Sequence, residues 1–294
     1  MLKYVGLSKA TYYYHLSIEG KIKIAPSNAG RPIRGYSMTS EGKKVCDDAI
    51  KDQIMEAIQD EAFFYGYHKI TIYLRTKMRL IINHKKVYRL CKELQILKKQ
   101  RVIKQPVKSR ISVNREIKKS NELWEADIKY GYIIGEDKFF FVLSIIDVFD
   151  RSIVDYHIGY SCTGSDAASL LRIALIRRDL FNSETKPIIR TDNGPQFISH
   201  VFENSCGEIN VYHERIPSRT PNKNAHIESF HRIMQDECIG VYEFNSYKEA
   251  YYQVASFMKR YNTNRMHSSI KYMSPNEFYA QYIGREVDGM IIRL

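Results

Sequence analysis

The stretch LWEADIKYGYII at residues 123–134 decides the fold that we predict for this chain. Its aromatic and β-branched residues are typical of a β-strand, and the alternation puts Glu125 and Asp127 on one face, with Trp124 and Ile128 on the other. Four more strand-like runs follow it: KFFFVLSIIDVF at 138–149, RSIVDYHIGY at 151–160, PIIRTD at 187–192 and VYHERI at 211–216.

Helical patterns alternate with these strands. SDAASLLRIALIRRDLF at 165–181 is amphipathic and has Ser165 as a plausible N-terminal cap. NAHIESFHRIMQDECI at 224–239 and SYKEAYYQVASFMKRYN at 246–262 are two further helical patterns. Three strands, a helix, a strand and then more strand and helices is a mixed α/β order, which predicts a central sheet flanked by helices.

The N-terminal part has a different pattern. Apolar residues recur at helical spacing in three short segments between about 46 and 98, and Asn83 is placed to cap the third. Lys85, Lys86 and Arg89 lie on that third segment, as in a helix-turn-helix that presents a basic helix to DNA. A small helical bundle whose lysines are merely solvated is the alternative.

Charge divides the chain in the same way. The formal net charge is +12, yet residues 1–120 hold 26 Lys and Arg against 10 Asp and Glu, whereas the remainder holds 19 against 23. A basic segment favours a polyanionic partner such as DNA. The segment 100–119, which contains Arg101 and Lys104, has no clean period and is predicted to be a linker that follows phosphates. A solvated basic surface without a partner is the alternative.

Several classes of protein are excluded. The five cysteines contain no C-x-x-C pair, which argues against a zinc knuckle or a disulfide scaffold and agrees with a reducing cytoplasm. The most apolar run, FFFVLSII at 139–146, is too short to span a bilayer, and the N-terminus lacks the apolar core of a signal peptide. We therefore expect a cytoplasmic protein without a membrane partner.

Three acidic residues lie within or beside predicted buried elements, where the apolar pattern would lead one to expect apolar residues. Asp127 lies within a strand, Asp192 ends one, and Glu228 flanks the buried stripe of a helix. Two divalent ions held by carboxylates can catalyse phosphodiester transfer, and Mg²⁺ prefers such oxygen ligands. Taken singly, each acid has an ordinary explanation as a polar strand residue, a turn residue or a solvated helix residue. Together with the basic N-terminal part, they favour one metal site.

The sequence motifs around these acids resemble those of the integrase-type core of D-D-E transposases, in particular the second-reading-frame product of the IS-three insertion-sequence family. Between Asp192 and Glu228 lie 35 residues, which is the spacing of that family. The matching words are WEAD at 124–127, IIDVFDR at 145–151, TDNGPQF at 191–197, NAHIESF at 224–230, YNTNRMHSSI at 261–270 and MSPNEF at 273–278, with YGYHKI at 65–70 and KKVYRL at 85–90 in the helix-turn-helix region.

The resemblance implies an RNase-H-like core with a mixed five-stranded sheet, preceded by a small all-α helix-turn-helix domain. It implies that Asp127, Asp192 and Glu228 are the catalytic residues and ligands of two Mg²⁺ or Mn²⁺ ions. The domains expected are an N-terminal segment at 1–45, the helix-turn-helix domain at 46–99, the linker at 100–119, the catalytic core at 120–282 and a C-terminal tail at 283–294.

Further residues within or beside the same motifs have expected roles. Asn193 and Gln196 are expected to shape the loop beside the site or to contact DNA, and Asp147 to be structural or to support the metal ligands from behind. His226 and His231, which flank Glu228, are assigned to packing or DNA contact. Two positions depart from the family pattern: Gln235 replaces a Lys or Arg seven residues after the Glu, and His68 replaces an Arg.

The function expected is therefore a DNA transposase that binds the ends of an insertion sequence and transfers DNA strands. Such an enzyme is expected to act on terminal inverted repeats and target DNA at the bacterial nucleoid, as a multimer, with fusion to or pairing with an upstream-frame protein. A metal-dependent nuclease that does not join strands and a non-catalytic DNA-binding regulator are the alternatives.

Overall fold

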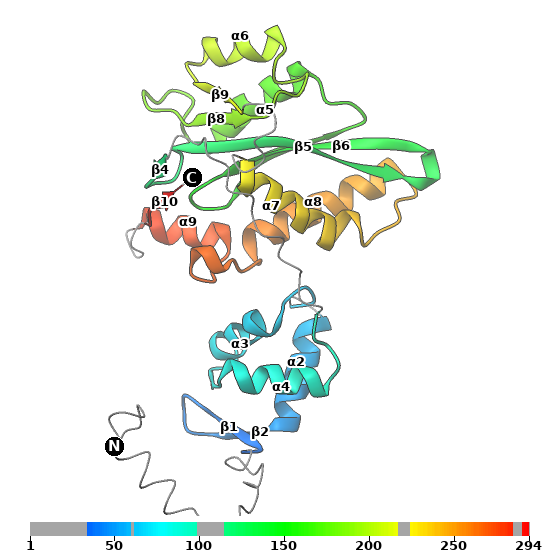
Figure 1. The fold of residues 1–294 in the computed structure, drawn as a ribbon, viewed down its shortest axis with the longest axis vertical. Helices are drawn as coiled ribbons and strands as arrows, with labels where there is room; N and C mark the ends of the chain where they lie inside the picture. Colours follow the sequence, from blue (N-terminus) through cyan, green and yellow to red (C-terminus); the bar gives the residue numbers. More distant parts are fainter. Residues whose placement is uncertain (1–33, 60–61, 99–114, 217–223, 285–289, 294) are drawn as a thin grey trace, which may run out of the picture.

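The computed structural model describes residues 34–59, 62–98, 115–216, 224–284 and 290–293. These residues form a small N-terminal domain and a larger α/β core (Figure 1). Within the described ranges, no helix is both long and apolar enough to cross a membrane.

The core is built on one mixed sheet of five strands in the order β7-β6-β5-β8-β9. Strands β5, β6 and β7 are antiparallel neighbours, and β8 and β9 continue the sheet parallel to β5. The bounds are β5 Leu123–Ile133, β6 Lys138–Asp147, β7 Ile153–Gly159, β8 Ile188–Thr191 and β9 His213–Arg215. All five predicted strands and the RNase-H-like α/β class are confirmed.

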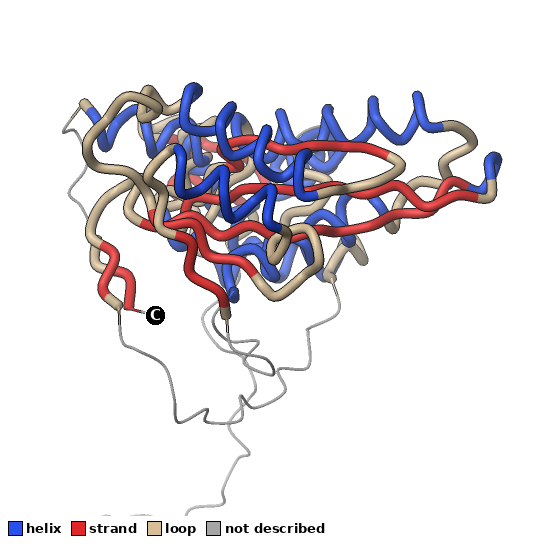
Figure 2. The backbone as a smooth tube through the Cα atoms, turned by 90° about the horizontal axis from the view of Figure 1, so that it is seen from above, coloured by secondary structure: helices blue, strands red, loops and turns tan. Residues whose placement is uncertain are grey.

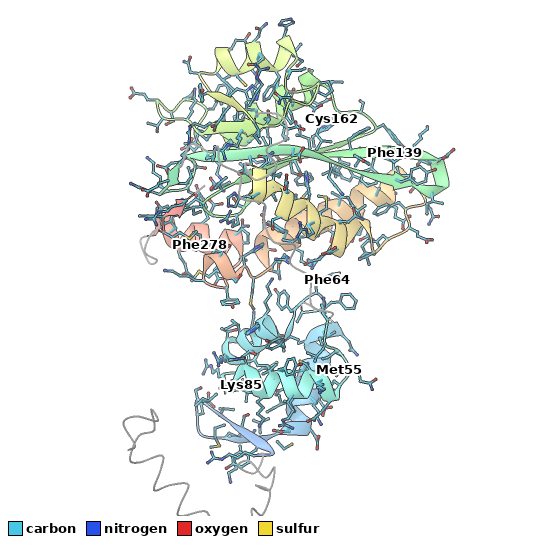
Figure 3. The ribbon with its side chains drawn as sticks, viewed as in Figure 1. Met55, Phe64, Lys85, Phe139, Cys162 and Phe278 are labelled. Carbon is cyan, nitrogen blue, oxygen red and sulfur yellow. The ribbon has the colours of Figure 1, made fainter. Side chains whose placement is uncertain are left out.

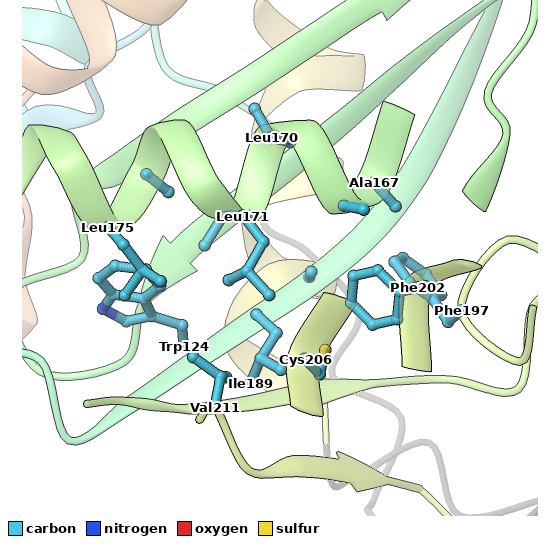
Figure 4. Packing of buried hydrophobic residues seen from close by; sticks show 14 of the residues in the cluster. Trp124, Ala167, Leu170, Leu171, Leu175, Ile189, Phe197, Phe202, Cys206 and Val211 are labelled. Atoms are coloured by element: carbon cyan, nitrogen blue, oxygen red, sulfur yellow. The ribbon is translucent and has the colours of Figure 1, made fainter. Parts of the chain in front are cut away.

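Helices α5 (Gly164–Arg177) and α6 (His200–Glu208) cover one face of the sheet. Their apolar side chains enclose Trp124 and its strand neighbours in one cluster (Figure 4). The predicted cap Ser165 is wrong, because Thr163 has the extended backbone of a cap and exchanges hydrogen bonds with Asp166, while Ser165 already lies in the first turn. Helix α6 was not predicted.

The opposite face is covered by α7 (Ala225–Met234), a π-helical turn η3 (Gln235–Ile239) and α8 (Tyr247–Thr263), so that the sheet is the middle of three layers (Figures 1 and 2). Ile227, Phe230 and Met234 are buried there, as the predicted stripe requires. Both expected helices are confirmed, and the π-turn ends the first of them.

The C-terminal part closes one end of the core. Helix α9 (Pro275–Ile283) packs Phe278 against Phe149, and strand β10 (Ile292–Arg293) pairs antiparallel with β4 (Glu116–Ile117). Two 3₁₀ turns, η1 (Ile134–Glu136) and η4 (Ser268–Ile270), complete the core. Strands β4 and β10 lie within the segments expected as linker and tail, and the domain bounds stay a prediction.

The N-terminal domain contains α2 (Asp47–Gln59), α3 (Tyr67–Thr76) and α4 (His84–Glu93) around one apolar cluster. The Asn83 side chain accepts a hydrogen bond from the Lys85 amide, which confirms the predicted cap. The domain is not all-helical: β1 (Tyr36–Thr39) pairs with β2 (Lys44–Cys46) and β3 (Leu80–Ile81). Strands this short show no hydrophobic period, so the sequence pattern did not reveal them.

The two domains touch through the turn before α3 and the segment after α8. The Tyr65 hydroxyl donates to the Asn264 carbonyl (3.1 Å) and accepts from the Met266 amide (3.2 Å). Burial lowers the pKa of Lys69 to about 7; the charge of Arg265 adds to this effect and that of Glu237 opposes it.

Candidate active site

Asp127 and Asp192 lie side by side in the sheet. Strand β8 runs parallel to β5 and pairs Thr191 with Ala126, so each aspartate is the next residue after a paired position. Adjacent strands are about 4.8 Å apart. The two carboxylates therefore start from neighbouring points at the C-terminal end of β8, where open α/β sheets bind their ligands.

Glu228 reaches the same region from α7. The buried Glu125 carboxylate, two residues before Asp127 on β5, accepts hydrogen bonds at one oxygen from the amides of His226 (3.0 Å) and Ile227 (2.9 Å). These are amides of the first turn of α7, which have no partner within the helix. Glu125 thus anchors the start of α7 to β5, one residue before Glu228.

The electrostatics of the three acids are coupled. Burial raises the pKa of Asp192, the charge of Asp127 raises it further, and the hydrogen bond from the Gly194 amide opposes both. Burial also raises the pKa of Glu228; Asp127 and Glu125 add to it, while Arg232 and His231 lower it. Asp127 acts on both other acids, so the three carboxylates share one region of negative potential.

Two of the three acids have partners within the protein. Asp127 accepts from the Ile128 amide (2.8 Å) and lies 3.4 Å from the His231 ring, and Asp192 accepts from the Gly194 amide (2.9 Å). In the part of the chain that the structure describes, no three His, Cys, Asp or Glu side chains are already arranged to hold a metal ion. By donor chemistry the set fits a hard divalent cation, because three mutually repelling carboxylates offer only oxygen ligands.

Asp147 lies deeper and serves the fold. It accepts hydrogen bonds from the Asn121 amide (2.7 Å), the Trp124 indole (3.1 Å) and the amides of Phe149 (2.8 Å) and Asp150 (3.2 Å). On the sheet it pairs with Trp124, three residues before Asp127. The donors come from the turn before β5, from β5 itself and from the turn after β6, which fits a structural role; support of the metal ligands by Asp147 stays a prediction.

The loop after β8 is fixed by its own polar groups. The Asn193 side chain donates to the Ile216 carbonyl (2.8 Å), and the Gln196 carbonyl accepts from the Ser199 hydroxyl (2.8 Å). A Cβ at Gly194 would meet the side chains of Gln196 and Asp192, so these two side chains pack closely over this glycine. The loop-shaping role fits these contacts, and DNA contact by Asn193 and Gln196 stays a prediction.

The basic residues expected to bind DNA fall into three groups. Lys85 is exposed on α4, whereas Lys86 and Arg89 bind Asp47 at 2.5 Å and 2.6 Å. Arg101 and Lys104 lie outside the described residues. The pattern correctly predicted a basic helix but could not show which of its cations were already paired.

Two residues near the site were not singled out from the sequence. Glu125 shares the strand face of Asp127, and its flanking by buried Trp124 and Ala126 was the available signal. Arg232 follows Glu228 by one helical turn, is exposed, and lowers the pKa of Glu228. Spacing of four residues on one helix predicts such a pair.

Comparison with known families agrees with this arrangement. Residues 118–221 and residues 209–275 each match an integrase core domain family, and residues 46–104 match an HTH-like domain. The chain therefore carries an integrase core domain preceded by an HTH-like domain. The first of these matches spans Asp127 and Asp192, the second spans Glu228, and the HTH-like match spans helices α2 to α4.

Similar whole proteins come from bacterial insertion elements. The chain is 29% identical over 244 residues to the IS476 uncharacterized 39.2 kDa protein of Xanthomonas euvesicatoria, covering 83% of this chain and 68% of that protein. It is 23% identical over 292 residues to the putative transposase InsK for IS150 of Escherichia coli K12, covering 96% and 93%. Among solved structures, the HTLV-2 integrase catalytic core in complex with magnesium is 16% identical, with TM-score 0.38, covering 54% of this chain and 96% of that one.

Proposed function

We propose that this integrase-core enzyme is a DNA transposase that binds the ends of its own insertion sequence, cleaves one strand and joins the freed end to new DNA. Asp127, Asp192 and Glu228 are the catalytic carboxylates and would hold two Mg²⁺ or Mn²⁺ ions. The observation that carries this proposal is that the fold brings three acids far apart in sequence toward one end of the central sheet: Asp127 and Asp192 each follow a paired strand position, and the first turn of α7, which carries Glu228, is hydrogen-bonded to β5.

The reaction needs two displacements at phosphorus. In the first, a water oxygen bonds to phosphorus and the bond to the 3′ oxygen breaks, leaving a free 3′-hydroxyl. In the second, that hydroxyl attacks another phosphodiester, forms a new P–O bond and releases the oxygen it displaces. When bound, divalent ions activate the attacking oxygen and stabilise the leaving one.

The chain's own residues provide rigidity and charge for these steps. Asp127 and Asp192 project from adjacent strands, and the Glu125 hydrogen bonds hold the first turn of α7 so that Glu228 stays at the same edge. Such positioning matters, because an error of about 1 Å can cost about a hundredfold in rate. The exposed Arg232 offers a positive charge beside Glu228 for a DNA phosphate.

The partners follow from the same proposal. The substrate is DNA of the terminal inverted repeats and of the target, and joining two ends calls for a multimer on DNA. The relatives from IS476 and IS150 support an insertion-sequence origin. Membership of the IS-three family, and fusion to or pairing with an upstream-frame protein, are part of this proposal.

A strand-transfer assay on duplex DNA of the element end, with Mg²⁺ or Mn²⁺, tests the proposal. We expect joined products from the wild type and a loss of at least a hundredfold in Asp127→Asn, Asp192→Asn and Glu228→Gln. Glu243→Gln, at an exposed acid outside the site, is the matched control and should be unaffected. Unimpaired joining in Glu228→Gln would overturn the assignment.

The assay also separates the alternatives. Cleavage without joined products in the wild type would identify a nuclease. Binding without metal-dependent cleavage would identify a regulator. Either result contradicts the proposed transposase activity.

A further inference from the structure

Helix α4 divides its charged residues between two sides. Val87, Leu90 and Cys91 are buried against the domain core. At 100° per residue, Lys86, Arg89 and Glu93 project on one side of that buried stripe. The remaining outward positions form a second side made of His84, Lys85, Tyr88 and Lys92.

The first side is neutralised within the domain. Asp47, at the start of α2, binds Lys86 (2.5 Å) and Arg89 (2.6 Å), and Arg89 also binds Glu93 (2.8 Å). The side chains of Lys86 and Arg89 are only 17% and 29% exposed. Glu93 in turn binds Lys51 of α2 (2.9 Å). These cations join α4 to α2, and contact with DNA would require them to leave carboxylate partners.

The second side is open and not neutralised. In the described part of the chain, neither Lys85 nor Lys92 has a carboxylate within ion-pair distance. Tyr88 is 42% exposed, and its ring contacts that of Tyr67 at the start of α3 (5.1 Å). In Figure 3, Lys85 lies on α4, farther from the core than Phe64.

A residue of α3 extends this open side. The exposed His68 ring stacks on the His84 ring at 5.3 Å with an interplanar angle of 27°. His84 is the first residue of α4, and the N-terminus of a helix carries partial positive charge. Lysines, histidines and a tyrosine hydroxyl thus combine hydrogen-bond donors and positive charge in one stripe.

We propose that His84, Lys85, Tyr88 and Lys92, supported by His68, form the surface that reads the sequence of duplex DNA. This inference rests on the proposed function, since the DNA to be read is the element end. The major groove admits an α-helix, and the N-terminal residues of a recognition helix contact base edges. Lys86 and Arg89 hold the helix in place and do not read DNA.

Two adjacent lysines provide a matched test. Lys85→Ala and Lys86→Ala remove the same charge from the same helix, one from each side. Binding of the full-length chain to duplex DNA of the flanking inverted repeat, and to a shuffled duplex of equal length, is measured by fluorescence anisotropy. Thermal denaturation of each variant is measured alongside, with Tyr88→Ala as a third variant.

We expect Lys85→Ala to weaken end binding about tenfold or more, with its melting temperature unchanged. Tyr88→Ala should lower the ratio of end affinity to shuffled-DNA affinity about fivefold or more. Lys86→Ala should change end affinity less than about threefold and should lower the melting temperature, because Asp47 loses a partner.

Several results would overturn this assignment. One is a loss of end binding in Lys86→Ala that equals the loss in Lys85→Ala without a change in melting temperature. Another is an affinity for end DNA equal to that of the wild type in both Lys85→Ala and Tyr88→Ala. This outcome overturns the assignment also if these variants change the self-association of the chain. If the wild type joins element ends while the open-side variants bind normally, only this inference fails; a wild type without preference for end DNA refutes the proposed function as well.

Discussion

Replacement of Glu125 tests whether the start of α7 is held by hydrogen bonds or by charge. Both backbone amides, of His226 and Ile227, bond to the same oxygen of Glu125. Glu125→Gln keeps one carbonyl oxygen that can accept both bonds, whereas Glu125→Ala removes the acceptor and leaves two amides near the buried sheet unsatisfied.

The size of the effect follows from those two amides. A buried donor without a partner costs about 1–3 kcal/mol, so Glu125→Ala should lower the free energy of unfolding by about 4 kcal/mol. For a domain of about 150–250 residues, that loss corresponds to a decrease of about 8–16 °C in melting temperature. Glu125→Gln should cost about 1 kcal/mol, the loss of a charge-assisted bond.

Two measurements on the full-length chain decide the matter. Thermal denaturation gives the stability, and the rate of metal-dependent cleavage of element-end DNA gives the effect on the position of Glu228. We expect at least a tenfold slower rate in Glu125→Ala and less than threefold in Glu125→Gln. Ser246→Ala, which removes the cap of α8, is the control: it should cost about 1 kcal/mol without changing the cleavage rate.

A Glu125→Gln variant as unstable and as slow as Glu125→Ala would contradict this prediction. The negative charge of the residue would then matter, and not the hydrogen bonds to the first turn of the helix.

Further predictions concern the rest of the fold. Asp47→Asn should lower the free energy of unfolding by about 1–3 kcal/mol, because two cations of α4 lose their charged partner, and urea denaturation will show this. Gly135→Ala should destabilise the chain by about 1–3 kcal/mol, because a Cβ there would meet the Asn245 backbone, whereas Gly207→Ala has open space around it; a larger loss in the second variant would contradict the packing argument. The pKa of Lys69 is lowered to about 7, so the folded state binds this proton more weakly than the unfolded state and stability from this group should rise between about pH 7 and pH 10. Lys69→Met should flatten that rise in urea denaturation at pH 7 and pH 9.5, and an unchanged slope would disprove the burial of this charge.

The sequence by itself determined the class of fold. Alternation in 123–134 and the apolar runs after it correctly predicted five strands, since helices cover both faces of the sheet and its strands are accordingly rich in apolar, aromatic and β-branched residues. Helices with a buried apolar stripe, such as α7, could be predicted from the sequence equally well. Short elements were not, because β3 and β10 have two residues each and show no period.

The tertiary structure decided which polar groups act together. Glu125 anchors α7 through hydrogen bonds from His226 and Ile227, which lie 101 and 102 positions further along the chain. Sequence spacing cannot reveal contacts over such separations. The sequence likewise presented Lys85 and Lys86 as equivalent, and only the approach of Asp47 from α2 separates them. Hydrophobic pattern is local along the chain, whereas charge pairing depends on which helices meet, and for that reason candidate residues follow from the sequence but their pairing follows only from the fold.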